Sequence, residues 1–254
     1  MKKALLLIDR GSREPEVKEE LKTICMFSKT RGNYIYSTYC FLEVISPSIE
    51  DGINQCLKFS PDLIVIVPYF LYPGLKLKDS VKKSAIFAST NNVRIAITKP
   101  LCYSDILTTI IHDRIKSLKS KYKIDYKNHT CDVLLIGHGS SDRRATEAFF
   151  YTANSLCGHY RNVKPCFLEL EKPNIEMGIK SLLETSPKVI LAIPYFLHKG
   201  IHIKKDVLNE LNLVMTKYSY KNIYFGKHIG TDERMVDLIF ERTNEVINRI
   251  IIKK

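Results

Sequence analysis

The chain has 254 residues, enough for one large domain or two ordinary ones of about 100–150 residues each. Hydrophobic residues make up 45% and charged residues 26%, which excludes a disordered or collagen-like chain. Lysine and arginine number 39 against 27 aspartate and glutamate residues, so the net charge is +12. This surplus predicts a polyanionic partner, which could be nucleic acid, an anionic membrane or a small molecule rich in carboxylates or phosphates.

The seven cysteines are an odd number and form no CxxC pair, so neither a disulfide framework nor a structural zinc site is expected. Reduced, buried thiols are typical of a cytoplasmic protein. The apolar run near residue 5 ends at Asp9 and is too short for a signal peptide, and the longest uncharged stretch, residues 63–75, contains two prolines. We therefore expect a soluble, cytoplasmic, monomeric protein.

The predicted elements follow the same order twice along the chain. Residues 5–13 (LLLIDRGSR) align with residues 134–141 (LLIGHGSS), and residues 40–74 align without a gap with residues 166–200, where 18 of 35 positions are identical. Each half of this duplication has the size of a domain rather than of a solenoid unit. Because the join falls near the polar stretch 119–128, we predict an N-terminal domain at residues 1–125 and a C-terminal domain at residues 126–254.

Each half is expected to alternate strands and helices. In the first half, Pro15 and Ser46-Pro47 mark helix starts, because proline suits the first helical turn. In the second half, short continuously apolar runs predict strands buried on both faces of a parallel sheet, at residues 132–136, 163–168, 189–196 and 222–225. Apolar residues at helical spacing predict helices at residues 145–156 and 232–250. The expected fold class is α/β, with two similar tandem domains that each contain a small parallel sheet flanked by helices.

Histidine and carboxylate residues follow the predicted strands of the second half. The first strand ends in a Gly-His-Gly motif around His138, the second ends in Glu169, and the third leads to His198 and His202. Parallel sheets place their sites at the carboxyl ends of the strands. Imidazole with carboxylate suits a divalent ion such as iron, cobalt or nickel, and both groups can accept protons near neutral pH. The role of His198 stays open because its repeat partner is Tyr72.

Three motifs in fixed order give the chain a resemblance to a known family. HGS follows the first strand of the second half, FLE is followed by a proline, and PYFL-x-x-G-x-H is followed by an acidic residue. The chain resembles the sirohydrochlorin chelatases, which are class II tetrapyrrole chelatases, over essentially its whole length in their long, two-half form. The resemblance implies ATP-independent insertion of a divalent metal into a reduced macrocycle with eight carboxylates, without an organic cofactor. It maps the catalytic and metal-binding residues of the family onto His138, Glu169 and His202.

The hypothesis that follows is a ferrochelatase, a lyase that inserts Fe2+ into sirohydrochlorin to make sirohaem. Cobalt insertion towards cobalamin is the alternative from the same class, and Ni2+ also suits these ligands. A non-catalytic tetrapyrrole- or metal-binding protein and a basic nucleic-acid binder are the alternatives from other classes. Because the basic residues are spread over both halves, we expect neither a nucleic-acid nor a membrane partner. The residues expected to bind the substrate carboxylates are Arg10, Lys76, Arg143, Arg144, Lys204 and Lys205.

The first half departs from the family pattern. Arg10 stands where the second half has His138, and Lys76 stands where it has His202. Guanidinium and ammonium groups offer no lone pair and repel a divalent cation, so Glu43 is expected to stand alone and the first half to bind no metal. We expect one metal site per chain, in the second half, although a site across both halves stays open because clefts between domains are favoured ligand sites. The first half would then be either a carboxylate clamp or a structural partner.

Overall fold

The computed structural model describes residues 1–90, 94–200 and 202–252, with the side chains of all of these except 75–77, 88–90, 202–204 and 251–252. The chain forms two compact units: unit 1 comprises Met1–Cys102 and Thr231–Lys254, and unit 2 comprises Tyr103–Gly230. Each unit contains a four-stranded sheet in which all neighbouring strands are parallel. The predicted α/β class with two similar sheets is therefore confirmed.

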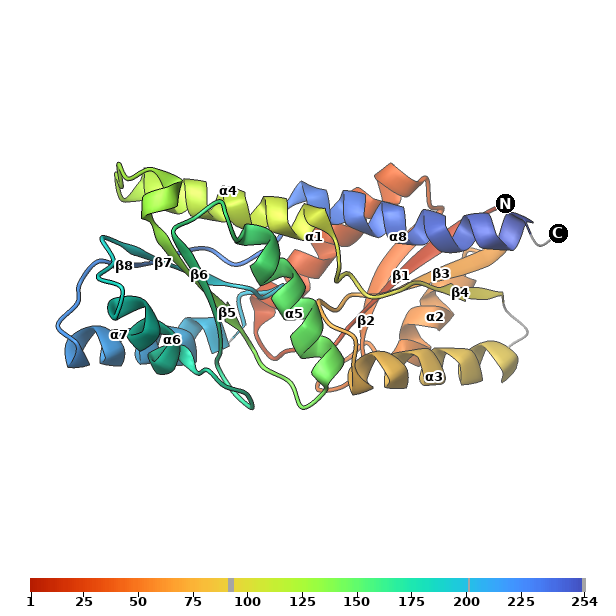
Figure 1. Ribbon diagram of the computed structural model, residues 1–254. Helices are drawn as coiled ribbons and strands as arrows, with labels where there is room; N and C mark the ends of the chain where they lie inside the picture. Colours follow the sequence, from red (N-terminus) through yellow and green to blue (C-terminus); the bar gives the residue numbers. More distant parts are fainter. Residues whose placement is uncertain (91–93, 201, 253–254) are drawn as a thin grey trace. The chain divides into compact units, whose positions relative to one another are not determined.

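Unit 1 is a sheet of strand order β2-β1-β3-β4 with a pair of helices over each face (Figure 1). Strand β3 is buried at every residue, which is why its sequence LIVIVP is continuously apolar. Helices α1 and α8 pack together over one face of the sheet, and α2 and α3 lie over the other. The elements are β1 (Lys3–Asp9), α1 (Pro15–Gly32), β2 (Tyr36–Phe41), α2 (Ile49–Leu57), β3 (Leu63–Pro68), α3 (Leu75–Thr90), β4 (Ile95–Ile97) and α8 (Glu233–Ile252).

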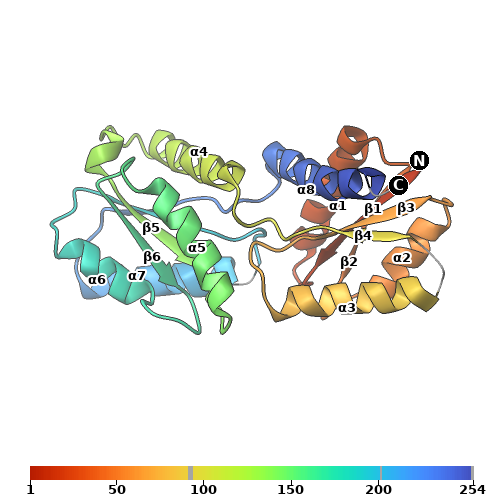
Figure 2. The same cartoon turned by 45° about the vertical axis from the view of Figure 1, so that its right-hand side comes forward.

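Unit 2 repeats this arrangement with the strand order β6-β5-β7-β8. Helices α4 and α5 cover one face of the sheet, and α6 and α7 cover the other (Figure 2). The elements are α4 (Asp105–Lys121), the 3-10 helix η1 (Asn128–Thr130), β5 (Asp132–Gly137), α5 (Arg143–Leu156), β6 (Asn162–Phe167), α6 (Ile175–Leu183), β7 (Ile190–Pro194), the π-helix η2 (His202–Val207), α7 (Leu208–Lys217) and β8 (Ile223–Phe225).

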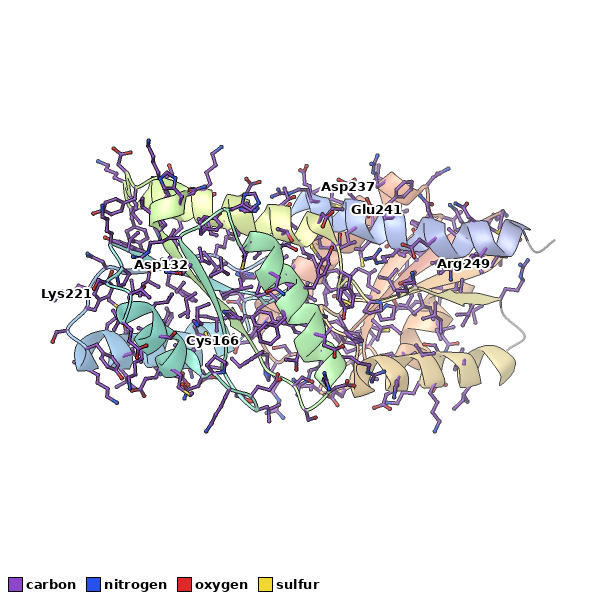
Figure 3. The ribbon with its side chains drawn as sticks, viewed as in Figure 1. Asp132, Cys166, Lys221, Asp237, Glu241 and Arg249 are labelled. Carbon is purple, nitrogen blue, oxygen red and sulfur yellow. The ribbon has the colours of Figure 1, made fainter. Side chains whose placement is uncertain are left out.

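The two units exchange the last helix of each sequence repeat. Helix α4 follows β4 along the chain but packs on α5 and β7 in unit 2, whereas α8 follows β8 but packs on α1 and β3 in unit 1. On α8, Asp237 (labelled in Figure 3) forms an ion pair with Arg31 of α1, with 3.0 Å between Arg31 Nη2 and Asp237 Oδ1. The compact units therefore differ from the division at residues 125 and 126, which follows the repeat rather than the packing.

The start of α2 corrects one prediction. Pro15 lies in the first turn of α1, as predicted, but α2 begins at Ile49, two residues after Pro47. Its N-cap is Ser48, whose Oγ accepts from the backbone N–H of Asp51 at 3.1 Å, while the Asp51 carboxylate accepts from the backbone N–H of Ser48 at 2.8 Å. This reciprocal capping satisfies two free N–H groups and sets the helix start. The strands and helices predicted for the second half match β5 to β8, α5 and α8, with ends that differ by a few residues.

All seven cysteines are free, and six of them are buried. Cys166, labelled in Figure 3, lies in the core of unit 2, where burial raises the pKa of its thiol well above the ordinary value. Such a thiol is inert as a nucleophile, so the six buried cysteines serve the packing. In the part of the chain that the structure describes, none of the helices has both the length and the apolar character needed to cross a bilayer.

A histidine pair fixes the exchanged helix α4 in unit 2. The Nδ1 atom of His112 on α4 lies 2.8 Å from the hydroxyl of Tyr160, and the ring of His112 meets the ring of His159 edge-on, with centroids 4.9 Å apart. Burial and the neighbouring His159 lower the pKa of His112 below its ordinary value of 6.5. The unfolded chain therefore binds more protons than the folded protein between the lowered pKa and pH 6.5, so stability is lost as the pH falls through this window.

We accordingly expect the free energy of unfolding to decrease on acidification from about pH 7 to about pH 5, and to decrease less in His112→Phe. Urea denaturation of both proteins at each pH measures this difference. His129→Phe is the control, because it replaces an exposed histidine in η1. Identical pH profiles for the wild type and His112→Phe would contradict the expectation.

A buried ion pair closes the amino end of β5. Asp132, labelled in Figure 3, is fully buried. Arg161 donates from Nε to its Oδ1 at 2.7 Å and from Nη2 to its Oδ2, and the side chain of Asn162 donates to Oδ1 at 3.1 Å. These donors compensate the loss of hydration that a buried carboxylate suffers.

Arg161→Ala is expected to lower the free energy of unfolding by about 3–5 kcal/mol, because it leaves the Asp132 carboxylate buried without its cation. Arg143→Ala is the matched control, since the Arg143 side chain is 91% exposed beside Glu147 and its removal is expected to cost less than about 1 kcal/mol. Urea unfolding of the two variants checks the difference. Equal stability of the two variants would contradict the importance given to the buried pair.

Candidate metal site

The turn after β5 places His138 beside Glu169. The backbone N–H of Glu169 donates to the carbonyl oxygen of His138 at 2.9 Å, so residues that follow the ends of β5 and β6 are hydrogen-bonded neighbours. Gly139 makes this approach possible: its φ is +94°, and a Cβ at this position would lie 1.9 Å from the carbonyl oxygen of Glu169. Only glycine fits both the left-handed backbone and the space. The Gly-His-Gly motif thus brings the histidine and the carboxylate residue to one edge of the sheet.

The His138 side chain is half-buried between the turn and the segment that follows β7. Its ring meets the Phe196 ring edge-on, with centroids 6.3 Å apart, and its Nδ1 atom lies 3.3 Å from the carbonyl oxygen of Gly139. A carbonyl accepts only from a protonated nitrogen, so this contact favours the tautomer with the hydrogen on Nδ1 and the lone pair on Nε2. In that tautomer Nε2 carries the lone pair that a metal ion would need, and Nε2 is itself buried in the structure.

A second glutamate, which the sequence did not single out, holds the turn. The Glu171 carboxylate accepts from the backbone N–H of Ser140 at 2.8 Å through Oε2 and from the hydroxyl of Thr146 through Oε1. Glu169 itself is exposed. The repeat gives no signal for Glu171, because the equivalent residue of the first half is Ile45. Glu171 therefore stabilises the loop, while Glu169 faces solvent at the edge.

The other predicted histidines follow β7. The buried Tyr195 continues β7, and its hydroxyl accepts from Thr152 at 3.1 Å. His198 is half-buried in the segment that follows. His202 begins the π-helix η2, but its side chain lies outside the described residues. Among the side chains that the structure describes, no group of three or more His, Cys, Asp or Glu residues is arranged to hold a metal. The structure thus brings together His138 and Glu169 and leaves the position of the His202 side chain as a prediction.

The residues predicted to bind substrate carboxylates differ in their surroundings. Arg144 donates to the carboxylate of Asp142, the N-cap of α5, through both Nε and Nη2, and this hydrogen-bonded partner raises the pKa of Arg144. Arg143 is 91% exposed and pairs with Glu147, with 3.1 Å between Nε and Oε1. Lys205 is exposed on η2. The predictions for Lys76 and Lys204 fall on side chains outside the described residues.

The equivalent edge of unit 1 has the same turn, but Arg10 stands there in place of the histidine. Gly11 has a φ of +100°, and a Cβ there would lie 2.3 Å from the carbonyl oxygen of Glu43, as at Gly139. The Nε atom of Arg10 donates to the Glu43 carboxylate at 3.0 Å. The prediction that Glu43 stands alone is therefore wrong, because Glu43 is paired with Arg10. Arg10, at the position equivalent to His138, carries a permanent positive charge, so it neutralises the Glu43 carboxylate.

Comparisons with known proteins show the family to which the chain belongs. The family model described as CbiX matches residues 4–118 and 132–246, one match for each sequence repeat. The chain is 27% identical to the sirohydrochlorin ferrochelatase of Priestia megaterium, over 89% of this chain and 85% of that protein. It is 24% identical to the sirohydrochlorin cobaltochelatase of the same organism, over 96% of this chain and 79% of that protein. The solved structure of SirB from Bacillus subtilis with Fe3+ is similar with a TM-score of 0.79 and 25% identity, covering 97% of this chain and 96% of that chain.

Proposed function

The chain belongs to the CbiX family, and from that membership together with the strand-edge geometry we propose that it is a sirohydrochlorin ferrochelatase. The observation that carries the proposal is the hydrogen bond that places His138 and Glu169 side by side at the carboxyl edge of unit 2. Two relatives named for iron insertion match 89% and 96% of the chain. The metal ion is a substrate in this reaction, and the protein supplies the ligands and the proton acceptors.

The reaction exchanges one cation for two protons. Fe2+ enters the ring of sirohydrochlorin, two pyrrole N–H protons leave, and sirohaem forms, without ATP. His138 is proposed to deliver the metal through Nε2, with His202 as a second ligand from the start of η2. Glu169, exposed beside His138, is proposed to accept a pyrrole proton. Imidazole and carboxylate suit both tasks because each offers a lone pair near neutral pH.

The substrate carboxylates are proposed to bind basic side chains near the same edge. Arg143 and Lys205 are the better candidates, since Lys205 is exposed and Arg143 is 91% exposed and pairs with Glu147 through Nε alone. Arg144 is less suited because its guanidinium already serves Asp142. Arginine can bind a carboxylate through two parallel hydrogen bonds, which orients the ring as well as attracting it. The net charge of +12 adds a long-range attraction for a polyanionic substrate.

The test is to mix the purified protein with sirohydrochlorin and Fe2+ under anaerobic conditions and to follow the absorption spectrum. The proposal predicts conversion to the metallated ring at a rate well above that of the protein-free control. Absence of conversion with every divalent metal, together with a spectral shift on binding the free ring, would instead indicate a tetrapyrrole-binding protein without catalysis. The full chain is used, because the exchanged helices make each unit depend on both sequence repeats.

Cobalt insertion is the second candidate, and the similarity to a cobaltochelatase over 96% of the chain favours it. Iron, cobalt and nickel accept the same ligand types, so the ligands do not decide the metal. Measuring kcat/KM with Fe2+ and with Co2+ in the same assay separates the two. We propose that the Fe2+ value is the higher one, and that the protein acts as a monomer in the cytoplasm, where its free cysteines stay reduced.

A further inference from the structure

The loop after β8 is held by an arginine that comes from the other sequence repeat. Arg114 lies on α4, which belongs to the first repeat but packs in unit 2. It donates from Nε to the carbonyl oxygen of His228 at 2.8 Å and from Nη2 to the carbonyl oxygen of Ile229 at 2.5 Å. Residues 228–230 are buried, so these carbonyls need protein partners. The planar guanidinium supplies two donors in a fixed geometry, which a lysine cannot.

The same loop is bonded to the segment that forms one wall of the candidate site. The backbone N–H of Ile229 donates to the carbonyl oxygen of Phe196, and that of Gly230 to the carbonyl oxygen of Leu197, both at 3.0 Å. The Phe196 ring is the one that meets the His138 ring edge-on. Leu197 directly precedes His198 and leads towards η2. A continuous set of contacts thus runs from Arg114 through the loop to the surroundings of His138.

In unit 1 an arginine holds the equivalent loop in the same way, beside a sheet edge that lacks the histidine. Arg242 on α8 donates from Nε to the carbonyl oxygen of Pro100 at 3.2 Å and from Nη2 to that of Cys102 at 2.9 Å. The intervening N–H of Leu101 donates to the carbonyl oxygen of Phe70 at 2.9 Å, as Ile229 does to Phe196. The two arginines therefore hold equivalent loops, although Arg242 also pairs with Glu245 at 3.1 Å, and only Arg114 holds a loop next to the candidate site.

We propose that Arg114 is a positioning residue for the metal site of unit 2. By holding residues 228–230 against Phe196 and Leu197, it fixes the wall that packs on His138 and the start of the segment that carries His198. The first repeat, whose own edge has Arg10 in place of a histidine, then contributes to metal insertion through its exchanged helix. The inference rests on the proposed function insofar as it takes His138 as a metal ligand.

The experiment compares Arg114→Ala and Arg114→Lys with Arg242→Ala and Arg242→Lys in the full chain. Three quantities are measured for each: the urea concentration at half-unfolding, the Kd for Co2+ from its absorption bands, and kcat and KM for sirohydrochlorin. Both alanine variants are expected to lose similar stability. Arg114→Ala alone is expected to weaken Co2+ binding or to lower kcat by about 10–100-fold, the range found when groups that orient metal ligands are removed. Arg114→Lys is expected to recover part of this loss.

Equal Co2+ affinity and equal kcat in Arg114→Ala and Arg242→Ala would overturn the inference, because the arginine would then serve stability alone. His138→Ala in the same titration separates this result from a failure of the proposed function. If His138→Ala binds Co2+ like the wild type, the metal site itself is wrongly placed and the inference is overturned with it. If Co2+ binding depends on both His138 and Arg114 while sirohydrochlorin is not metallated, the positioning role is supported and the proposed reaction is wrong.

Discussion

Replacing His138 with alanine is expected to abolish metal insertion and to leave the fold intact. The side chain is half-buried on a turn after the strand, where the backbone makes the hydrogen bonds and the ring adds little to the core. Loss of the imidazole removes the lone pair proposed to hold the metal. Turnover of sirohydrochlorin with Fe2+ measures the effect, and circular dichroism checks the fold. His202→Ala is expected to behave in the same way if it supplies the second ligand.

Two substitutions serve as controls for the His138 experiment. His129→Ala removes an exposed histidine on η1 and is expected to leave kcat unchanged. Arg10→Ala acts at the equivalent turn of unit 1 and breaks the ion pair with Glu43. If Arg10 binds substrate carboxylates, Arg10→Ala is expected to have a higher KM for sirohydrochlorin and an unchanged metal affinity. If Arg10 is only structural, neither the KM nor the metal affinity is expected to change. Normal turnover in a folded His138→Ala protein would contradict the assignment of the site.

Replacing Glu169 with glutamine is expected to slow insertion by about 10²–10⁴-fold if the carboxylate accepts a pyrrole proton. Glutamine keeps the shape and the backbone hydrogen bond to His138 but cannot take up a proton. A much smaller effect on kcat with weaker metal binding would indicate a ligand role instead. The kcat and the Co2+ affinity of the variant, measured together, separate these two roles.

Glu43→Gln is the matched control, because Glu43 occupies the equivalent position in unit 1 and is paired with Arg10. Its side chain is 35% exposed, and its loss is expected to change kcat by less than about three-fold, because the pair is partly exposed and the first repeat is expected to bind no metal. A Glu169→Gln enzyme that turns over as fast as Glu43→Gln would remove Glu169 from the mechanism.

Strand periodicity and the internal duplication were enough to predict the two parallel sheets. The continuous apolar runs of β5 and β7 are a direct consequence of burial on both faces, so composition alone reveals them. Because parallel strands end at one edge of the sheet, the residues after β5 and β6 were expected to lie close together. His138 and Glu169 could therefore be assigned to one edge from the sequence. The hydrogen bond between their backbones requires Gly139, and the sequence carries that glycine.

Three features could not be predicted in this way. The exchange of α4 and α8 cannot be recognised from the sequence of either helix, because the two repeats have the same fold and each helix could cover either sheet. The support that Glu171 gives to the turn depends on a side chain without a counterpart in the first repeat. The ion pair between Arg10 and Glu43 was not predicted, because Arg10 was expected to bind substrate carboxylates and Glu43 to stand alone, whereas opposite charges at neighbouring strand ends also pair with each other.

The most direct test of one metal site per chain is to count the Co2+ ions bound by wild type and variants, using calorimetry at equal protein concentration. We expect one equivalent for the wild type, one for Arg10→Ala with Lys76→Ala, and none for His138→Ala with His202→Ala. Two equivalents in the wild type, or one that survives the loss of both histidines, would contradict a single site in unit 2.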